Sequence, residues 1–368
     1  MHRYPVILWL VFLLAACRQT GESLRAPAPN DYAEFFEINR LDKKNVLKVK
    51  EIYPGGKAQI IVLSHEEPSA RSKDTIYIKI PVESYITTSV THLQSLKSLG
   101  VIHLMKAFPN TDYIADPDIL KRVRQGLITD IGSPNAMDTE KVFAINPDVI
   151  FVFGSGPRDK SYDLLEQNGI KVVYVAEWME THPLGRAEWI KFFGLFFDKK
   201  STADSIYQHI KSRYGQWTVR NADTLQRPKI FQGGRYGDKW YVPGGKSWVA
   251  RLIHDAGGQY LITNNETAST LLNNEQALLL LEQADIWINP GTWTSFTRLE
   301  EEFPPVRQFK VFKHKKIYSA YIKTNDFGKN EYFEKSVLYP DKLLEDYRSI
   351  FSENYPKNEL NFMQALPE

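Results

Sequence analysis

The stretch ITDIGSPNAMDTEKVFAINPDVIFVFGSGP, residues 128–157, contains a complete helix, strand and turn and predicts the fold of the whole chain. Asp138 is placed to cap a short helix that Asn146-Pro147 ends. Val149–Phe153 is an unbroken apolar run, typical of a strand covered on both faces of a parallel sheet. Residues 154–157 then turn the chain at the carboxyl end of this strand, the edge where ligands bind in open α/β sheets.

A similar pattern, LNNEQALLLLEQADIWINPGTW, returns at residues 272–293. Glu275 there corresponds to Glu140 in the first stretch, near the start of each expected helix. A small polar turn and an amphipathic helix that ends at glycine precede each stretch, at residues 87–100 and 244–258. The repeated pattern predicts two similar α/β lobes.

The composition is that of a globular protein with enough apolar residues for a large core. Of the 368 residues, 43% are hydrophobic and 13% aromatic, and a chain of this length favours two domains. The 46 basic and 44 acidic residues leave a net charge of only +2, so we expect no nucleic-acid partner. The single cysteine excludes an intramolecular disulfide framework and any cysteine-based zinc cluster.

The N-terminus has the layout of a secretory signal. A short basic start precedes an apolar stretch that is too short to span a bilayer and ends in Leu14-Ala15-Ala16-Cys17. This ending resembles a bacterial lipobox, whose cleavage would leave Cys17 as the lipid-carrying first residue; the alternative is an uncleaved signal anchor with an incidental cysteine. We expect a signal peptide over residues 1–17, a flexible tether over residues 18–30, and lipid anchoring on the periplasmic side of a bacterial membrane.

The rest of the chain divides into two lobes and a linker. We expect an N-terminal lobe over residues 31–183, with an extra strand-rich section at its start, a helical linker over residues 184–225, and a C-terminal lobe over residues 226–368. Helical spacing in the linker predicts a rod of about 30 Å from Ser201 to about Asn221. Strands are expected near residues 84–88, 102–105, 149–153, 172–175, 230–232, 286–288 and 317–319, and a closing helix at residues 341–352.

Several short motifs follow one another in a specific order. They are Thr87-Thr88-Ser89 with Leu99-Gly100, Asp130-Ile131-Gly132, Glu140 with Asn146-Pro147-Asp148, Gly169-Ile170, Asp255-Ala256-Gly257-Gly258, Glu275, and Asn325-Asp326 ahead of Pro340-Asp341. In this order the chain, over residues 81–355, resembles the substrate-binding proteins of ABC importers for iron(III)-siderophores, haem and cobalamin. The run after Asn325-Asp326 is longer than that family's usual one, and the strand-rich section is extra; both differences concern the identity of the ligand more than the fold.

The resemblance implies two Rossmann-like lobes with mostly parallel sheets, bridged by a single long helix, with a ligand cleft between them. It also implies a monomeric receptor that performs no bond chemistry and needs no cofactor. Such a receptor captures an iron(III)-siderophore-like chelate, or alternatively cobalamin or haem, and delivers it to an ABC permease. In this family a glutamate of each lobe meets permease arginines, which assigns docking to Glu140 and Glu275. The alternative is simple placement in a first helical turn, where the helix dipole favours a carboxylate by about 0.3 to 1 kcal/mol.

The expected cleft is lined by the turns at the carboxyl ends of the strands. Aromatic side chains in these turns would give a flat metal chelate or corrinoid broad stacking faces, although some of them are candidates for the core. Arg235 and Lys239 could also hold a carboxylate or phosphate. The predicted ligand contacts are Tyr85, Ser89, Phe108, Tyr113, Trp178, Arg235, Tyr236, Lys239, Trp240, Trp293, Tyr321 and Asn325.

Other functional classes are less well supported by the sequence. No two histidines have metal-ligand spacing, which argues against a receptor for bare zinc or manganese. Residues 154–156 lack the Lys-Ser/Thr that follows in a phosphate loop. Two rivals remain: a secreted cleft enzyme, which would carry a titratable cluster with shifted pKa values in its cleft, and an adhesive surface lipoprotein, which would lack a deep cleft.

Overall fold

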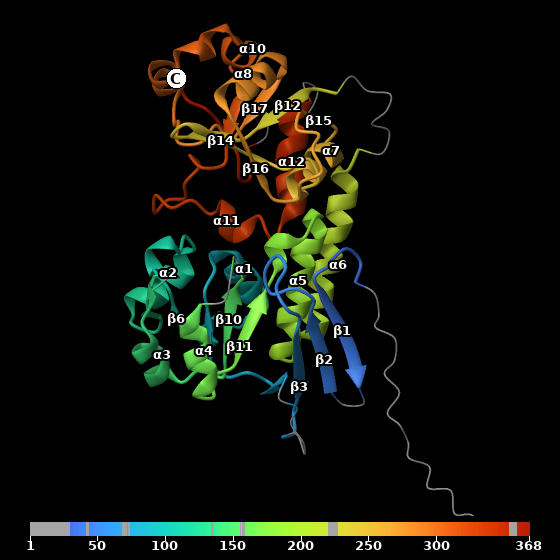
Figure 1. Cartoon of the computed structure of the whole chain (residues 1–368), viewed down its shortest axis with the longest axis vertical. Coiled ribbons are helices and arrows are strands. Elements are labelled where there is room, and N and C mark those ends of the chain that lie inside the picture. The colour runs from blue at the N-terminus through green and yellow to red at the C-terminus, as the bar shows by residue number, and fades with distance from the viewer. Residues whose placement is uncertain are drawn as a thin grey trace, which may run out of the picture.

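Two sheets, each at the centre of its own lobe, organise the chain as the repeated sequence pattern predicts. The computed structural model describes residues 30–41, 44–67, 72, 74–133, 136–154, 156, 159–219, 227–352 and 359–368. The predicted signal peptide, Cys17 and residues 18–29 of the predicted tether lie outside these residues. The two lobes are stacked along the long axis of the molecule (Figure 1). The predicted fold class, α/β with mostly parallel sheets, is confirmed.

The N-terminal lobe is built on a parallel sheet with the strand order β11-β10-β5-β6-β7. The strands are β5 (Tyr85–Thr87), β6 (Met105–Phe108), β7 (Thr129–Asp130), β10 (Val149–Phe153) and β11 (Val172–Val175). Between them run α1 (Val90–Ser98), α2 (Pro117–Arg124), the small hairpin of β8 (Gly132–Ser133) and β9 (Ala136–Met137), α3 (Thr139–Ile145) and α4 (Lys160–Gln167).

The stretch that decides the fold has the expected local structure. The Asp138 carboxylate accepts a hydrogen bond from the Lys141 backbone N–H at 3.0 Å and caps α3. Asn146 ends the helix in the left-handed conformation, with φ 47°. β10 then pairs with β11 on one side and β5 on the other, and four of its five residues are buried. Local capping and burial therefore both place this strand at the centre of the lobe.

The C-terminal lobe repeats the plan with the strand order β15-β12-β17-β18-β19. Four strands are parallel, namely β12 (Lys229–Gln232), β15 (Gln259–Tyr260), β17 (Ile286–Ile288) and β18 (Ile317–Ser319), and β19 (Gln364–Ala365) is antiparallel. A small antiparallel sheet adds β13 (Gly234–Tyr236), β14 (Lys239–Pro243) and β16 (Ser269–Leu272). The helices are α7 (Trp248–Asp255), α8 (Asn274–Gln283), α9 (Phe296–Glu302), α10 (Lys310–Lys313), α11 (Tyr332–Lys335) and α12 (Pro340–Phe351).

Helices α5 (Pro183–Phe196) and α6 (Lys200–Trp217) lie in the segment predicted as the linker. α5 lies with the N-terminal lobe, and α6 runs beside α5 up to α7 of the C-terminal lobe (Figure 1). α6 has 18 residues and is about 27 Å long. It packs against α5 and also against α12 of the C-terminal lobe, where Arg213 pairs with Asp341 at 2.9 Å. The Tyr214 hydroxyl donates to Asp255 of α7 at 2.8 Å. The link between the lobes is thus a bundle of packed helices.

Two predicted element boundaries are wrong. The strand expected at residues 102–105 begins only at Met105, because a turn of 3-10 helix precedes it. The helix expected to reach Asn221 ends at Trp217, because Thr218 is extended and its hydroxyl donates to a backbone carbonyl of the last turn. Asn221 itself lies outside the described residues.

The extra section is rich in strands, as predicted, and these strands form one four-stranded sheet. Its strands, in spatial order, are β1 (Phe36–Leu41), β2 (Lys44–Val49), β3 (Gln59–Ser64) and β4 (Thr75–Lys79). Phe36 packs on Trp189 and Phe192 of α5, with ring centroids 4.8 and 5.8 Å apart. This sheet, which we call the N-terminal sheet, therefore shares the core of the N-terminal lobe.

Two buried glutamates hold the segment before the N-terminal sheet. The Glu188 carboxylate, 0% exposed, accepts backbone N–H bonds from Asp31, Tyr32 and Ala33 at 2.8–2.9 Å and pairs with Lys191 at 2.7 Å. The Glu180 carboxylate accepts from the next two backbone N–H groups and from the Trp189 indole. Burial raises the pKa of Glu180 to about 7. Five successive backbone donors are thus satisfied by two side chains.

We expect Glu188→Ala to lower the free energy of unfolding by about 3 to 5 kcal/mol, because it leaves three backbone donors without their acceptor and removes the shorter of the two ion pairs of Lys191. Urea denaturation followed by circular dichroism measures this change. The matched control is Glu37→Ala, which removes an exposed ion pair to Lys50 and should cost less than about 1 kcal/mol. Equal effects of the two substitutions would show that the buried carboxylate has no special role.

Candidate ligand-binding cleft

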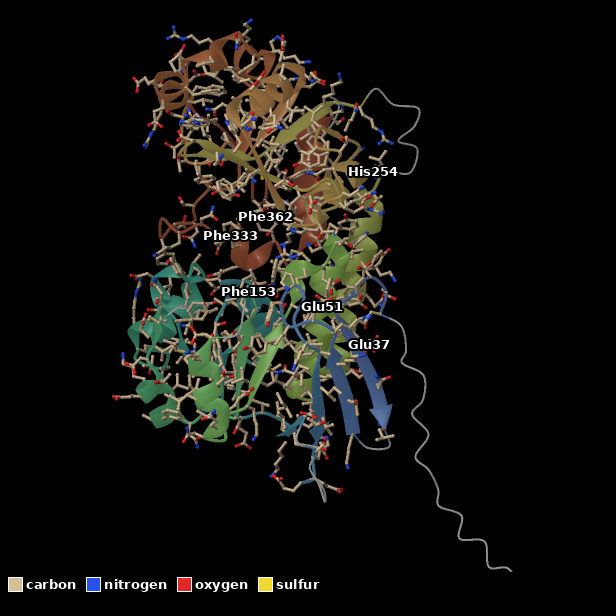
Figure 2. All side chains as sticks on the ribbon, in the orientation of Figure 1. Glu37, Glu51, Phe153, His254, Phe333 and Phe362 are labelled. Atoms are coloured by element: carbon tan, nitrogen blue, oxygen red, sulfur yellow. The ribbon has the colours of Figure 1, made fainter. Side chains whose placement is uncertain are left out.

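A cleft of about 630 Å³ lies between the lobes. Its lining comes from both lobes, from helix α5 and from segments next to strands of the N-terminal sheet. Phe153, at the end of β10, and Phe333, on α11, lie on opposite sides of it (Figure 2). The cleft therefore lies at the carboxyl end of the central strand of the N-terminal lobe, where the sequence places a ligand site.

Aromatic side chains form much of the cleft surface. Trp178 packs near Phe153, with ring centroids 5.9 Å apart, and its indole N–H is fixed by the Gly154 carbonyl at 3.0 Å. Across the cleft, Tyr321 and Phe333 are stacked at 5.8 Å with an interplanar angle of 14°. Such fixed rings provide flat faces on which a planar or rigid ligand can stack at low entropic cost.

A buried polar network lies beside the N-terminal side of the cleft. The Glu177 carboxylate, 2% exposed, accepts a hydrogen bond from the Thr91 hydroxyl at 2.5 Å and lies 3.7 Å from His92 Nε2. Burial alone would raise the pKa of Glu177, but His92, Arg186 and Thr91 together hold it below its usual value. Glu177 is therefore a fixed negative charge near the cleft residues Thr91 and Arg186.

The N-terminal sheet supplies one wall of the cleft through the loop after β2. Glu51, Pro54 and Gly55 of this loop line the cleft. The loop approaches the end of β10 so closely that a Cβ on Gly154 would lie 1.8 Å from the Ile52 carbonyl oxygen. Only glycine fits at position 154 with the loop in this place. The extra section is thus part of the candidate site.

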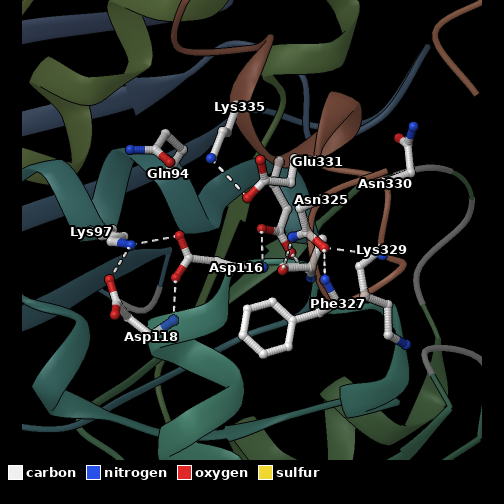
Figure 3. A network of polar contacts seen from close by, with 12 residues as sticks. Gln94, Lys97, Asp116, Asp118, Asn325, Phe327, Lys329, Asn330, Glu331 and Lys335 are labelled. Atoms are coloured by element: carbon white, nitrogen blue, oxygen red, sulfur yellow. Dashed lines mark hydrogen bonds and ion pairs between the residues drawn. The ribbon is translucent and has the colours of Figure 1, made fainter. Parts of the chain in front are cut away.

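A second contact between the lobes lies on the side of the cleft opposite α5 and α6. The Asn325 amide donates to the Ala115 carbonyl at 3.0 Å, and the Glu334 carboxylate accepts from the backbone N–H groups of Ala115 and Asp116 at 2.5 and 2.9 Å. The Lys329 ammonium group donates to a backbone carbonyl of the N-terminal lobe at 2.8 Å. Burial raises the pKa of Glu334 to about 7. Figure 3 shows this network, which we call the inter-lobe clasp.

The structure places three of the predicted ligand contacts on open cavity surface. Trp178 and Tyr321 line the cleft. Tyr236 lines an adjoining pocket of about 480 Å³, which shares Tyr321 and Asn289 with the cleft. These three residues remain candidates for ligand contact.

Four predicted contacts are wrong because their side chains belong to the core. Tyr85 packs on Phe197 and Phe108 is 1% exposed, both within the N-terminal lobe. Trp240 is 0% exposed and donates to the side chain of a residue of α8, and Trp293 stacks on a core phenylalanine at 5.6 Å. None of these rings can reach a ligand without repacking of the core.

The other five predicted contacts lie away from the lining of both cavities. Ser89 caps α1 next to the cleft residue Thr91, Tyr113 is 63% exposed, and Lys239 is exposed on β14. Arg235 donates to the Gly237 carbonyl, and the Asn325 amide donates to the Ala115 carbonyl in the inter-lobe clasp.

Sequence reasoning missed three cleft residues with clear chemistry: Arg186, Trp248 and Phe333. Trp248 carried a usable signal, since it begins the helix after the small polar turn at residues 244–247, the same position that Val90 has in the first lobe. Arg186 lies within a nearly all-buried helix, where no pattern marks it.

Glu140 and Glu275 occupy equivalent positions in the structure. Each is exposed and is the second residue of its helix, α3 or α8. The two helices belong to different lobes (Figure 1).

Two features are absent from the part of the chain that the structure describes. No group of three or more His, Cys, Asp or Glu side chains there could hold a metal ion. Within the same residues, no helix combines the length and apolarity needed to cross a bilayer.

Two α/β lobes joined by packed helices, with an aromatic cleft between them, define a two-lobe solute-binding protein. Residues 86–318, more than half of the chain, match the family described as periplasmic binding protein, and the chain belongs to that family. This confirms the resemblance inferred from the sequence motifs. The family and the structures below are solute-binding proteins rather than enzymes.

Sequence relatives include uncharacterized proteins of Methanocaldococcus jannaschii. One, an uncharacterized lipoprotein, is 29% identical over 237 residues, which cover 63% of this chain and 55% of the relative. A second is 24% identical and covers 61% of this chain and 67% of the relative. The first relative is thus matched over only about half its length.

Solved structures with the same fold include three binding proteins. A periplasmic haem-binding protein from Pseudomonas aeruginosa has a TM-score of 0.61 at 13% identity, over 78% of this chain and 99% of that one. A possible iron-binding protein from Staphylococcus epidermidis gives 0.55 at 14%, over 73% and 98%. The vitamin B12 binding protein of Vibrio cholerae gives 0.51 at 12%, over 73% and 96%. At these identities the likeness is one of fold.

We expect the two lobes to move little when a ligand binds, because packed helices connect them on one side of the cleft and the inter-lobe clasp on the other. Small-angle scattering should give nearly equal radii of gyration for free and loaded protein. The double variant Asn325→Ala, Glu334→Ala removes clasp bonds and should be more expanded when free and compact on loading. A wild-type compaction as large as that of the variant would contradict this expectation.

Proposed function

We propose that this protein is the lipid-anchored, extracytoplasmic substrate-binding component of an ABC importer and that it captures an iron(III)-siderophore-like metal chelate. The observation that carries the proposal is the cleft of about 630 Å³ between the lobes, with a pair of aromatic rings on each of two facing walls. A deep cleft argues against an adhesive surface lipoprotein. Family membership, with structural neighbours that include an ABC transporter substrate-binding protein, supports the transport role.

The ligand class can be tested by spectroscopy and titration. Ferric siderophores, haem and corrinoids have distinct visible spectra, so the absorbing species that copurifies with the protein identifies the class. Trp178→Ala and Tyr321→Ala should each weaken binding of that species by roughly tenfold, since each removes a stacking face. Tyr113→Ala, an exposed tyrosine outside the cleft, is the matched control. Haem or cobalamin as the bound species would replace the siderophore assignment, and failure of all these chelates to bind would overturn the proposal.

We expect Glu140→Ala and Glu275→Ala to separate binding from transport. Both carboxylates are exposed on equivalent helices and away from the cleft lining, so ligand affinity should stay unchanged. Loss of one partner of a desolvated pair with a permease arginine costs about 2 to 5 kcal/mol, so docking should weaken roughly thirtyfold or more. The assay is uptake in cells beside titration of the purified variants, with Glu282→Ala on the exposed side of α8 as control. Normal uptake by the double variant would rule out the docking role.

Cys17 is proposed as the site of lipid attachment. Cys17→Ser should release the chain from the membrane fraction or stall its processing, because the thiol carries the acyl chains that hold the protein at the bilayer. Fractionation followed by immunoblotting measures both outcomes, and the purified Cys17→Ser variant should keep the fold of the lobes and its ligand affinity. A variant that is processed and still bound to the membrane would disprove the anchor.

A further inference from the structure

Arg186 lines the cleft and lacks a hydrogen-bonding partner within the described residues. It is the fourth residue of α5, and its guanidinium carbon lies 4.7 Å from the centroid of the Trp248 ring. Its Nε is buried and has no hydrogen-bond partner. In the described part of the chain no carboxylate forms an ion pair with it. A buried guanidinium nitrogen without an acceptor is costly, and this half-buried side chain lines a space large enough for a ligand.

The surroundings of Arg186 hold it in place as a cation. Burial lowers its pKa, and the negative charge of Glu177 opposes that shift, so the guanidinium keeps its proton. The Trp248 ring lies against the guanidinium as a cation–π contact and restricts its position. The preceding Gly185 packs against the Tyr32 carbonyl, which restricts movement of this end of α5. Arg186 is therefore preorganised before any ligand arrives.

The neutral amides of the cleft add further donors. The Gln232 side-chain oxygen accepts from the Tyr347 hydroxyl at 2.8 Å, and the Asn289 side-chain oxygen accepts from the Ala320 N–H at 2.8 Å. Each amide therefore has its NH₂ group left for the cleft that it lines. The carboxylate of Glu51, the other charged residue of the described lining, accepts from the Gly55 N–H of its own loop.

We propose that the cleft selects a metal chelate with anionic oxygen groups and that Arg186 binds one of them, a carboxylate or catecholate, in bidentate fashion. This inference rests on the proposed transport function and narrows its substrate class. A guanidinium matches the two oxygens of such a group in geometry and charge. A neutral hydroxamate chelate or a corrinoid removes water from Arg186 without supplying a charged acceptor, so it binds more weakly.

The test compares anionic and neutral probes on four proteins: wild type, R186Q, R186K and R235Q. The anionic probes are a ferric tris-catecholate and hemin, and the neutral probes are a ferric trishydroxamate and cyanocobalamin. Iron-free 2,3-dihydroxybenzoate and citrate report on the anion site without a metal. Binding is followed by tryptophan fluorescence, to which Trp178 and Trp248 in the cleft contribute. Circular dichroism and thermal melting confirm that each variant is folded.

We expect R186Q to lose affinity for the anionic probe that binds wild type by roughly 10- to 100-fold, and for neutral probes by less than about threefold. R186K keeps the charge without the planar fork and should show an intermediate loss. R235Q is the matched control, because Arg235 carries the same charge outside the cleft lining and should change nothing.

Equal losses for anionic and neutral probes, no loss, or a wild type that prefers neutral chelates would each overturn the inference while leaving the transport function standing. If no chelate binds but a free anion does, with a loss in R186Q, the Arg186 site stands and the chelate-transport function falls. Absence of binding by every anion and chelate would overturn both.

Discussion

Burial of α5 on all sides is the constraint on which the rest of the structure depends. Twelve of its 14 residues are buried, so the helix has no free face. Phe193 packs against Phe151 of the central strand at 5.2 Å, and Trp189 packs against Phe36 of the N-terminal sheet. At Gly194 the helix approaches Ala203 of α6 so closely that an added Cβ would lie 2.7 Å away. The lobe, the added sheet and the linking helix are therefore fixed to one another through a single helix.

That arrangement also sets the electrostatics of the cleft. Because α5 is packed on all sides, Arg186 in its first turn has a fixed position in the cleft wall, near Glu177 and Trp248. The loop after β2 is also fixed. Ile52 contacts Gly154, and the Gln59 amide forms hydrogen bonds with the β11 backbone, donating to the Val172 carbonyl and accepting from the Tyr174 N–H. Residues before position 86, outside the region shared with the family, thus complete a wall of the cleft. Such an addition can change which ligand fits while the two lobes stay the same.

The sequence predicted the elements that depend on a few consecutive residues. It did not predict the positions of side chains that depend on contacts between distant parts of the chain. Val149–Phe153 and its helix cap were predictable because an apolar run and a capping aspartate act over a few residues. Trp240 was misplaced because it was treated as a loop residue; on β14 side chains alternate, so Trp240 points inward and Tyr241 outward. Arg186 gave no signal, since its meaning depends on Trp248 and Glu177, which the fold brings to it.

The inter-lobe clasp is a second connection between the lobes, on the flank of the cleft opposite α5 and α6. Asp116 joins the clasp to the N-terminal lobe. Its backbone N–H donates to the Glu334 carboxylate, while its own carboxylate caps α2 and pairs with Lys97 at 2.6 Å. Packed helices connect the lobes on the other flank. A displacement of one lobe relative to the other therefore has to break contacts at two separate places, one of them a small set of hydrogen bonds to the backbone of Ala115 and Asp116.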